Sequence, residues 1–353
     1  MLQSYWKKHT LKFKRPAGTS RGTLYSKDLW FVIVYDDAVP QIKGIGECSL
    51  LKGLSIDDRD DYEEKLSEVC KNISNYKFYL DSGLVEFPSI RFGLETALID
   101  LGIYENTKSE ENRGDHILFP SAFTEGKDSI EINGLVWMGE FDFMRKQIIE
   151  KIEAGFKCIK LKIGAIDFDK ELNLIKSIRD EFSAKDIEIR VDANGAFKTA
   201  DALEKLSRLA KYSLHSIEQP IKQGQWEEMA RLCELSPLPI ALDEELIGIN
   251  VITEKEKLLK IIHPQFIILK PSLLGGFKAS EEWIDLAEKN NTGWWVTSAL
   301  ESNIGLNAIA QWTYTLKNKM PQGLGTGQLF ENNFDSPLFI ESGRLWFSLE
   351  KKV

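Results

Sequence analysis

The hydrophobic pattern is most regular after about residue 128, where short apolar runs alternate with amphipathic segments. Within 167–183, Leu172, Ile175, Ile178 and Phe182 recur at the spacing of one helix face. The apolar runs recur about every 25 to 30 residues and begin near Ile130, Lys157, Ile187, Leu214, Leu238, Gln265, Gly293 and Pro321. Eight strand–helix units of this length predict an α/β fold of the (β/α)8 TIM-barrel type, with the glycine-rich eighth run as its weakest strand.

An open, doubly wound α/β sheet is the structural alternative to the barrel. That fold is favoured by a glycine-rich dinucleotide or phosphate loop after an early strand, and the chain contains neither motif. The segment GLGTGQ at 323–328 comes close, but it lacks the third glycine and lies near the C-terminus. The pattern therefore favours the barrel.

The first part of the chain lacks this alternation and is typical of an α+β unit. The short link at 36–40 suggests a hairpin between two strands, and Ser89 is a candidate helix cap. Alternating and β-branched residues predict three strands, at 3–14, 28–36 and 41–48. Helical spacing predicts two helices, at 57–76 and 88–104. The architecture expected is thus a barrel with a smaller second unit.

The boundaries of these units follow from the change of pattern. We expect residues 1–125 to form the α+β unit and residues 126–325 to form the barrel. The tail, 326–353, contains a predicted strand pair at 337–347 that we expect to return to the N-terminal unit.

Composition and charge narrow the classes of function. The 353 residues carry a net charge of −9, so the surface is a poor match for nucleic acid or an anionic membrane. The longest apolar run, at 29–35, is too short to span a bilayer, and the N-terminal residues do not resemble a signal peptide. The four cysteines are widely spaced, which favours a reducing, cytoplasmic setting. The oligomeric state does not follow from the sequence.

The candidate chemistry lies where successive apolar runs end. Chemically active side chains occur there at intervals of 25 to 30 residues, namely Lys162, Asp192, Glu218, Asp243, Lys270 and Ser298. In a barrel, the C-terminal ends of the strands meet at one mouth, where active sites are built. Lys160 and Arg190 precede Lys162 and Asp192 by two residues, so they also face the interior.

These residue types point to a metal-assisted reaction. Three carboxylates on adjacent strands repel one another without a cation, and ligands that are all oxygen suit Mg²⁺, with Mn²⁺ as the alternative. A metal makes a bound carboxylate substrate more acidic at its α-carbon. A lysine could then remove that proton if its pKa falls toward ~7–8, and Lys160 supplies a cationic neighbour for Lys162.

Each residue also has a plainer interpretation. A single Asp or Lys after a strand is usually a solvated turn or a helix cap, and Asp192 before Asn194-Gly195 fits a turn. A barrel that serves only as a binding or scaffold protein would be expected to have lost a ligand or a lysine. Six residues in phase with the barrel period favour an enzyme instead.

The chain resembles the muconate lactonizing subgroup of the enolase superfamily. The resemblance rests on KLK (160–162), VDANG (191–195), IEQP (217–220), LDE (242–244) and LKPSLLGG (269–276), and on GECSLL (46–51) and RFGLETALIDL (91–101) for a capping domain. It implies a barrel covered by an α+β capping domain built from the N-terminal segment and the C-terminal tail.

The resemblance also implies roles for individual residues. Asp192, Glu218 and Asp243 match the metal ligands of the family, and Asn194 and Glu244 match residues that surround those ligands. Lys162 matches the acid–base lysine, with Lys160 as its partner, and Lys270 matches the second lysine on the opposite face of the substrate.

Within the subgroup, TSALESNIGLNAIAQW (297–312) and GLGTGQLF (323–330) resemble the o-succinylbenzoate synthases of menaquinone biosynthesis. This implies loss of water from a small dicarboxylate, 2-succinyl-6-hydroxy-2,4-cyclohexadiene-1-carboxylate, through a metal-stabilised enediolate. An N-acylamino acid racemase or a cycloisomerase with the same lysines and metal is the alternative. Candidate substrate contacts are Ser298, Arg190 and the polar loop residues Thr19, Ser20 and Arg21.

Overall fold

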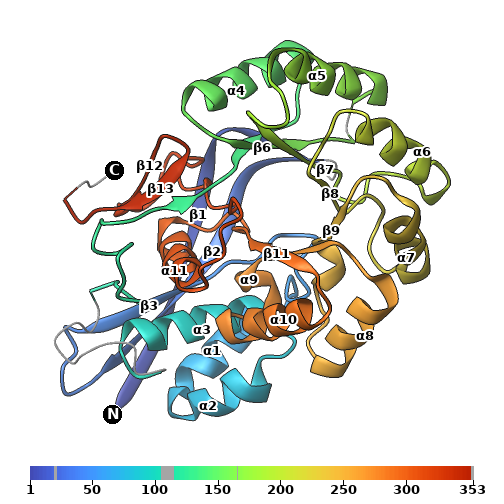
Figure 1. Ribbon diagram of the computed structural model, residues 1–353. Helices are drawn as coiled ribbons and strands as arrows, with labels where there is room; N and C mark the ends of the chain where they lie inside the picture. The colour runs from blue at the N-terminus through green and yellow to red at the C-terminus, as the bar shows by residue number, and fades with distance from the viewer. Residues whose placement is uncertain (20–21, 105–114, 165, 351–353) are drawn as a thin grey trace.

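The computed structural model describes residues 1–19, 22–104, 115–164 and 166–350. Figure 1 shows a ring of strands surrounded by helices, with a second, antiparallel sheet packed against it. The predicted fold class, a TIM-type barrel with an α+β capping domain, is confirmed.

The capping domain is built on a three-stranded antiparallel sheet in the order β1-β2-β3. β1 and β2 are longer than predicted where they meet, and the register of their pairing shifts between Lys12 and Ala17 of β1. The predicted hairpin after Asp36 is present, because β2 pairs with β3 in the antiparallel sense. The strand bounds are β1 (Leu2–Thr19), β2 (Gly22–Asp36) and β3 (Lys43–Cys48).

The helices of this domain pack against one face of the sheet, and residues of the barrel and the C-terminal tail pack against the other face. Gly44 and Gly46 of β3 allow α3 to approach closely, since an added Cβ would lie 2.0 Å from the Ala97 carbonyl oxygen and 1.8 Å from that of Gly93. The predicted helix 57–76 is broken into shorter pieces. The bounds are α1 (Tyr62–Lys71), η1 (Ile73–Asn75), α2 (Tyr76–Phe78), η2 (Tyr79–Gly83) and α3 (Pro88–Asp100).

The cap expected at Ser89 is supplied by another residue. Pro88 occupies the first turn of α3, and Asp57 accepts hydrogen bonds from the Ser89 backbone N–H at 2.8 Å and from its hydroxyl at 2.6 Å. At the other side of α3, Glu95 accepts hydrogen bonds from the backbone N–H groups of Phe277 and Lys278. This carboxylate fastens the capping domain to the start of a barrel helix.

Within the part of the chain that the structure describes, the barrel contains seven parallel strands in the order β11-β10-β9-β8-β7-β6-β5. The second to seventh predicted runs each contain one barrel strand. The first run is divided into β4 (Ile130–Glu131) and β5. The strand bounds are β5 (Gly134–Val136), β6 (Cys158–Lys162), β7 (Glu188–Asp192), β8 (Ser216–Glu218), β9 (Ile240–Leu242), β10 (Phe266–Leu269) and β11 (Gly293–Val296).

The eighth run closes the ring without forming a regular strand. Gln322 and Gly323 make isolated parallel bridges to Ile132 and Thr297, the neighbours on either side of the gap. The backbone bonds include Gln322 N–H to Glu131 at 2.8 Å and Gly323 N–H to Val296 at 2.8 Å. The glycines that weaken this run in the sequence thus leave it enough backbone pairing to complete the barrel.

The barrel helices surround the strands in Figure 1. The helix predicted within 167–183 is present, and Leu172, Ile175 and Ile178 are buried on one face. Asp167 caps its N-terminus by accepting hydrogen bonds from two backbone N–H groups. The bounds are α4 (Phe141–Glu153), α5 (Phe168–Glu181), α6 (Thr199–Ala210), α7 (Trp226–Leu235), η4 (Glu244–Leu246), α8 (Ile252–Ile262), α9 (Pro271–Leu274), α10 (Phe277–Lys289) and α11 (Asn303–Thr315).

The C-terminal tail divides between the two parts of the molecule. Phe330 bridges to Phe13 of β1 and joins an apolar cluster of the capping sheet. The predicted strand pair is present as β12 (Leu338–Glu341) and β13 (Arg344–Phe347), but β13 pairs with β4 at the foot of the barrel. The hairpin therefore returns to the barrel, because the unpaired edge of β4 is the partner available to it.

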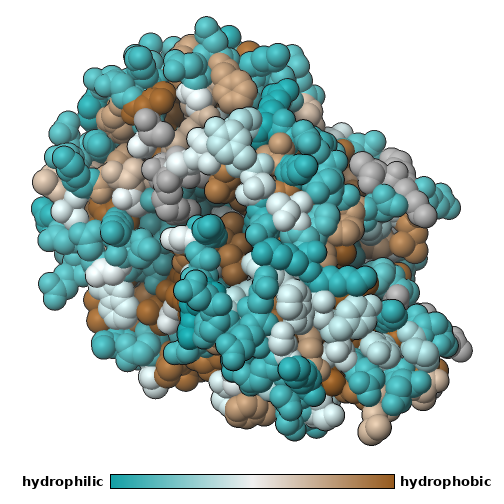
Figure 2. All heavy atoms as spheres, turned by 180° about the vertical axis from the view of Figure 1, so that it is seen from behind, coloured by the Kyte–Doolittle hydropathy of each residue, from teal (hydrophilic) through white to brown (hydrophobic). Residues whose placement is uncertain are grey.

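The apolar side chains are largely internal. Hydrophilic side chains cover most of the face in Figure 2, with hydrophobic ones showing in smaller areas between them. In the described ranges no helix combines the length and the apolar character that a bilayer crossing requires.

Candidate active site

The barrel brings the predicted side chains together at one mouth. Lys162 of β6 pairs in register with Asp192 of β7, and Asp192 pairs with Glu218 of β8. Asp243 and Lys270 follow the ends of β9 and β10. Because the strands are parallel and in register, the convergence expected from the spacing is what the structure shows.

Lys160 and Lys162 both face the interior, as the two-residue spacing predicts. Lys160 Nζ donates hydrogen bonds to Asp192 at 3.2 Å and to Glu218 at 2.7 Å. Lys162 Nζ donates to the same Asp192 oxygen at 2.7 Å and to Asn194 Oδ1 at 2.8 Å. Lys160 thus lies between two carboxylates, and Lys162 lies one step nearer the mouth.

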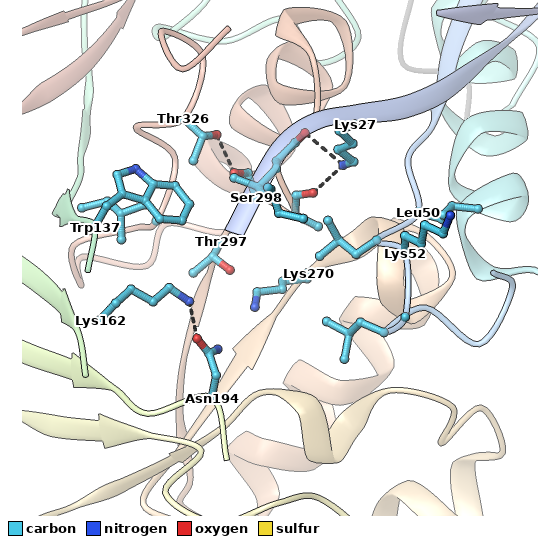
Figure 3. A pocket seen from close by; sticks show the side chains of 18 of the residues that line it. Lys27, Leu50, Lys52, Trp137, Lys162, Asn194, Lys270, Thr297, Ser298 and Thr326 are labelled. Atoms are coloured by element: carbon cyan, nitrogen blue, oxygen red, sulfur yellow. Dashed lines mark hydrogen bonds between the residues drawn. The ribbon is translucent and has the colours of Figure 1, made fainter. Parts of the chain in front are cut away.

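Lys270 completes the arrangement from the other side. Its ammonium group forms an ion pair with Asp243 and lies 3.8 Å from Glu218 Oε1. In Figure 3, Lys162 and Lys270 extend into the cavity from opposite sides. A ligand held between them would have an amine on each face.

Burial makes the charges of this cluster interact strongly. Although burial alone would lower it, the charges of Glu218 and Asp192 raise the pKa of Lys160 above its ordinary value. Burial and the Asp192 charge raise the pKa of Glu218 well above its usual range. For Asp192 the lysines outweigh burial and lower the pKa. The negative charges of Glu218 and Asp192 therefore oppose a lowered pKa at Lys160.

Two polar residues hold the cluster in place. Asn194, in the left-handed region with φ 46°, donates from Nδ2 to Glu244 Oε1 at 3.0 Å while accepting from Lys162. Gln219, also left-handed, accepts from the backbone N–H of Asp243 at 3.2 Å. Asn194 and Glu244 were predicted to surround the carboxylates. Gln219 was not singled out, although it follows Glu218 directly in the IEQP motif.

The three carboxylates have the donor chemistry of a site for a hard divalent cation. Asp192, Glu218 and Asp243 are at most 2% exposed, and the buried Glu218 Oε1 accepts no hydrogen bond within the described ranges. Oxygen donors of this kind suit Mg²⁺. In the structure these carboxylates form ion pairs with lysines. Among the described residues, no three or more acidic, histidine or cysteine side chains are arranged so that they could hold a metal ion.

A cavity of about 590 Å³ opens above this cluster, between the barrel and the capping domain. Ser298 lies in its wall as predicted, where its hydroxyl is 2.6 Å from that of Thr326 (Figure 3). Thr19 ends β1, and Ser20 and Arg21 lie outside the described residues. The structure therefore supports a wall position for Ser298 and leaves the expected loop contacts as predictions.

Arg190 does not reach the cavity, which corrects the substrate contact expected for it. Its guanidinium donates to Glu188 at 2.8 Å and to the Pro321 carbonyl at 2.9 Å, and stacks 4.2 Å from the centre of the Trp295 ring. The side chain is 1% exposed. Two residues along a strand separate layers of the barrel core, so Arg190 packs below the site.

Several residues that line the cavity were not predicted from the sequence. From the barrel these include Asn133, Leu135 and Trp137, whose two-residue spacing along the first strand predicts one inward face. The capping domain contributes Lys27, Trp30 and Leu50 to Leu54, and no local pattern marks them because they face the site only after the two parts pack together.

Comparisons with a family model and with known proteins agree on the family of this chain. The model of the enolase C-terminal domain-like family matches residues 144–350. The chain is 47% identical over 381 aligned positions to the o-succinylbenzoate synthase of Desulfotalea psychrophila, covering 98% of this chain and 99% of that protein.

Solved structures give the same result. The crystal structure of MenC from Desulfotalea psychrophila LSv54 has a TM-score of 0.84 and 43% identity, covering 98% of this chain and 99% of that one. A dipeptide epimerase from Enterococcus faecalis, complexed with Mg and a dipeptide, has a TM-score of 0.77 at 19% identity, covering 98% and 96%. At that identity the second likeness shows the fold alone.

Proposed function

The chain belongs to the enolase C-terminal domain-like family, and we propose that it is an o-succinylbenzoate synthase of menaquinone biosynthesis. The observation that carries the proposal is the 47% identity to a synthase across nearly the whole of both chains. The reaction removes water from 2-succinyl-6-hydroxy-2,4-cyclohexadiene-1-carboxylate and leaves the aromatic o-succinylbenzoate. A chain with this activity is a lyase that acts on a small molecule.

We assign the proton transfers to Lys162. As a neutral amine it takes the proton from the ring carbon that bears the carboxylate. The bond from the ring to the 6-hydroxyl oxygen then breaks, and the same lysine returns a proton so that hydroxide leaves as water. Its position above Lys160 and beside Asn194 supports this assignment, because its Nζ lies at the floor of the cavity.

Lys270 acts on the opposite face of the ring. Its ammonium group stabilises the negative charge that develops as the proton leaves, by electrostatic and cation–π attraction. Lys160 stays between Asp192 and Glu218 and holds their charges in place. Its ion pairs with both carboxylates support the role of a cation rather than a base.

Asp192, Glu218 and Asp243 are the residues that would hold a divalent cation, Mg²⁺ or Mn²⁺. When bound, the metal draws charge from the substrate carboxylate and makes the neighbouring C–H more acidic. Lys160 and Lys270 contact oxygens of Glu218 and Asp243, and the buried Glu218 Oε1, which accepts no hydrogen bond within the described ranges, could serve as a ligand. Asn194 and Glu244 would keep the ligand-bearing loops in position.

Removal of the metal tests this assignment. We expect chelation with EDTA to abolish loss of the cyclohexadiene substrate and Mg²⁺ to restore it. Mg²⁺ should also raise the midpoint of thermal unfolding, because a ligand that binds the folded state stabilises it. Glu218→Gln should lose both responses. Full turnover in the presence of EDTA would refute the metal site.

A further inference from the structure

The wall of the cavity contains a buried lysine that the proposed chemistry does not use. Lys27 of β2 is 7% exposed and donates hydrogen bonds to Ser49 Oγ at 2.5 Å, to the Ala299 carbonyl at 2.6 Å and to the Leu300 carbonyl at 2.9 Å. An ammonium group has three donors, and these bonds use all three. Lys27 therefore has no proton left to offer a substrate.

The two carbonyls belong to the loop 297–302, which forms part of the cavity wall. Leu300 adopts a left-handed conformation with φ 62°, which is unusual for a residue with a branched side chain. With this turn, the carbonyls of Ala299 and Leu300 both contact one ammonium group, as Figure 3 shows for Lys27 and its acceptors. Such a backbone persists only when its surroundings hold it.

The same loop carries groups toward the reacting site. Thr297 and Ser298 line the cavity, and the Ser298 backbone N–H donates to the Gly323 carbonyl at 3.1 Å. Glu301 accepts from the Ala299 N–H at 2.7 Å and also contacts Ser272, two residues after Lys270. The position of the loop is thus connected both to the wall and to the strand end that bears Lys270.

A second bond from the capping domain secures the end of the loop. Glu47 of β3 accepts hydrogen bonds from the backbone N–H groups of Ser302 and Gly305, each at 2.9 Å. Lys27 is the positively charged residue near Glu47 and Glu301. Burying its ammonium group would cost free energy if it had no hydrogen-bond or ion-pair partners. One positive and one negative side chain, Lys27 and Glu47, therefore join the capping domain to the β11–α11 connection.

We propose that Lys27 is a positioning residue for the dehydration, one that clamps the Ala299 and Leu300 carbonyls and so holds Thr297 and Ser298 against the substrate. The inference rests on the proposed function. It assigns Lys27 no contact with the substrate. Loss of the clamp should loosen the wall while Lys162, Lys270 and the carboxylates keep their places.

The test compares Lys27→Met and Lys27→Gln with a matched control. Lys255 is also a buried lysine, 1% exposed, that donates to a backbone carbonyl, that of Ala279 at 3.0 Å, but it joins α8 to α10 away from the cavity. Lys255→Met therefore reproduces the loss of a buried ammonium group without touching the wall. Lys27→Gln keeps two donors and guards against a variant that does not fold.

We expect hydrogen–deuterium exchange of the 297–302 amides to rise in both Lys27 variants and to stay unchanged in Lys255→Met. With the cyclohexadiene substrate, KM should rise about tenfold, the scale of one lost hydrogen bond, with a smaller change in kcat. Ser298→Ala should add little to the KM of Lys27→Met, because the two act through the same wall.

Unchanged exchange and unchanged KM in a folded Lys27 variant would overturn the proposal. So would an equal rise in Lys255→Met, which would show a general loss of stability. If the wild-type protein does not dehydrate the substrate, the proposed function fails, and the exchange measurement still decides whether Lys27 clamps the loop.

Discussion

Two lysines separated by one residue have different surroundings, and this difference assigns their roles. Lys160 lies between Asp192 and Glu218, and their charges raise its pKa despite burial. Lys162 contacts Asp192 and the amide of Asn194 at the cavity floor. The KLK motif therefore combines a fixed cation with the amine that we propose as the base.

Replacing the base should remove turnover without unfolding the protein. We expect Lys162→Ala to lower kcat by about 10²–10⁴-fold, the usual contribution of a general acid–base group. Steady-state kinetics measure the effect, and circular dichroism checks the fold. Lys176→Ala is a suitable control, since Lys176 is exposed on α5 and pairs with Asp180. Activity retained in Lys162→Ala would refute the assigned role.

At the scale of an element, the first turn of α3 is hydrogen-bonded to the buried carboxyl group of Asp57. Asp57 accepts hydrogen bonds from Ser89, yet burial outweighs them and raises the pKa of its carboxyl from 3.8 to about 6. The folded protein thus holds this proton more tightly than the unfolded chain. The stabilising contribution is complete below about pH 4 and is lost as the pH rises through 6.

This sign predicts a pH-dependent difference between the wild type and Asp57→Asn, which resembles the protonated acid. Between pH 4 and pH 7 the free energy of unfolding of the wild type should fall by about 2–3 kcal/mol relative to the variant. Urea unfolding at several pH values measures it, with exposed Asp58→Asn as the control. A difference that does not change with pH would contradict the buried-carboxyl explanation.

The elements of the barrel were predictable because local spacing determines them. Inward-facing residues alternate along each strand, so the phase of Lys160, Lys162 and Asp192 follows from the sequence. The pairing of β13 with β4 was not predictable, because it depends on which edge the barrel leaves open. Arg190 was wrongly expected to contact the substrate, because strand spacing gives the face of a residue but not its partners, here Glu188 and the Pro321 carbonyl.

At the scale of the whole molecule, the candidate site depends on two domains. The lysines and carboxylates were predictable from the strand ends, whereas the Lys27 clamp and the Leu50 to Leu54 wall depend on long-range packing. The net charge of −9 does not describe the cavity. Its lining contains Lys52, Lys162 and Lys270 as well as Asp28 and Asp58, and these lysines could attract a substrate with carboxylates.

The most direct test is turnover by the purified protein with Mg²⁺. The account predicts that the absorbance of 2-succinyl-6-hydroxy-2,4-cyclohexadiene-1-carboxylate falls and that one o-succinylbenzoate forms for each molecule consumed. The same preparation should be tested with a single enantiomer of an N-succinyl amino acid. Racemisation of that compound without any loss of the cyclohexadiene would contradict the account.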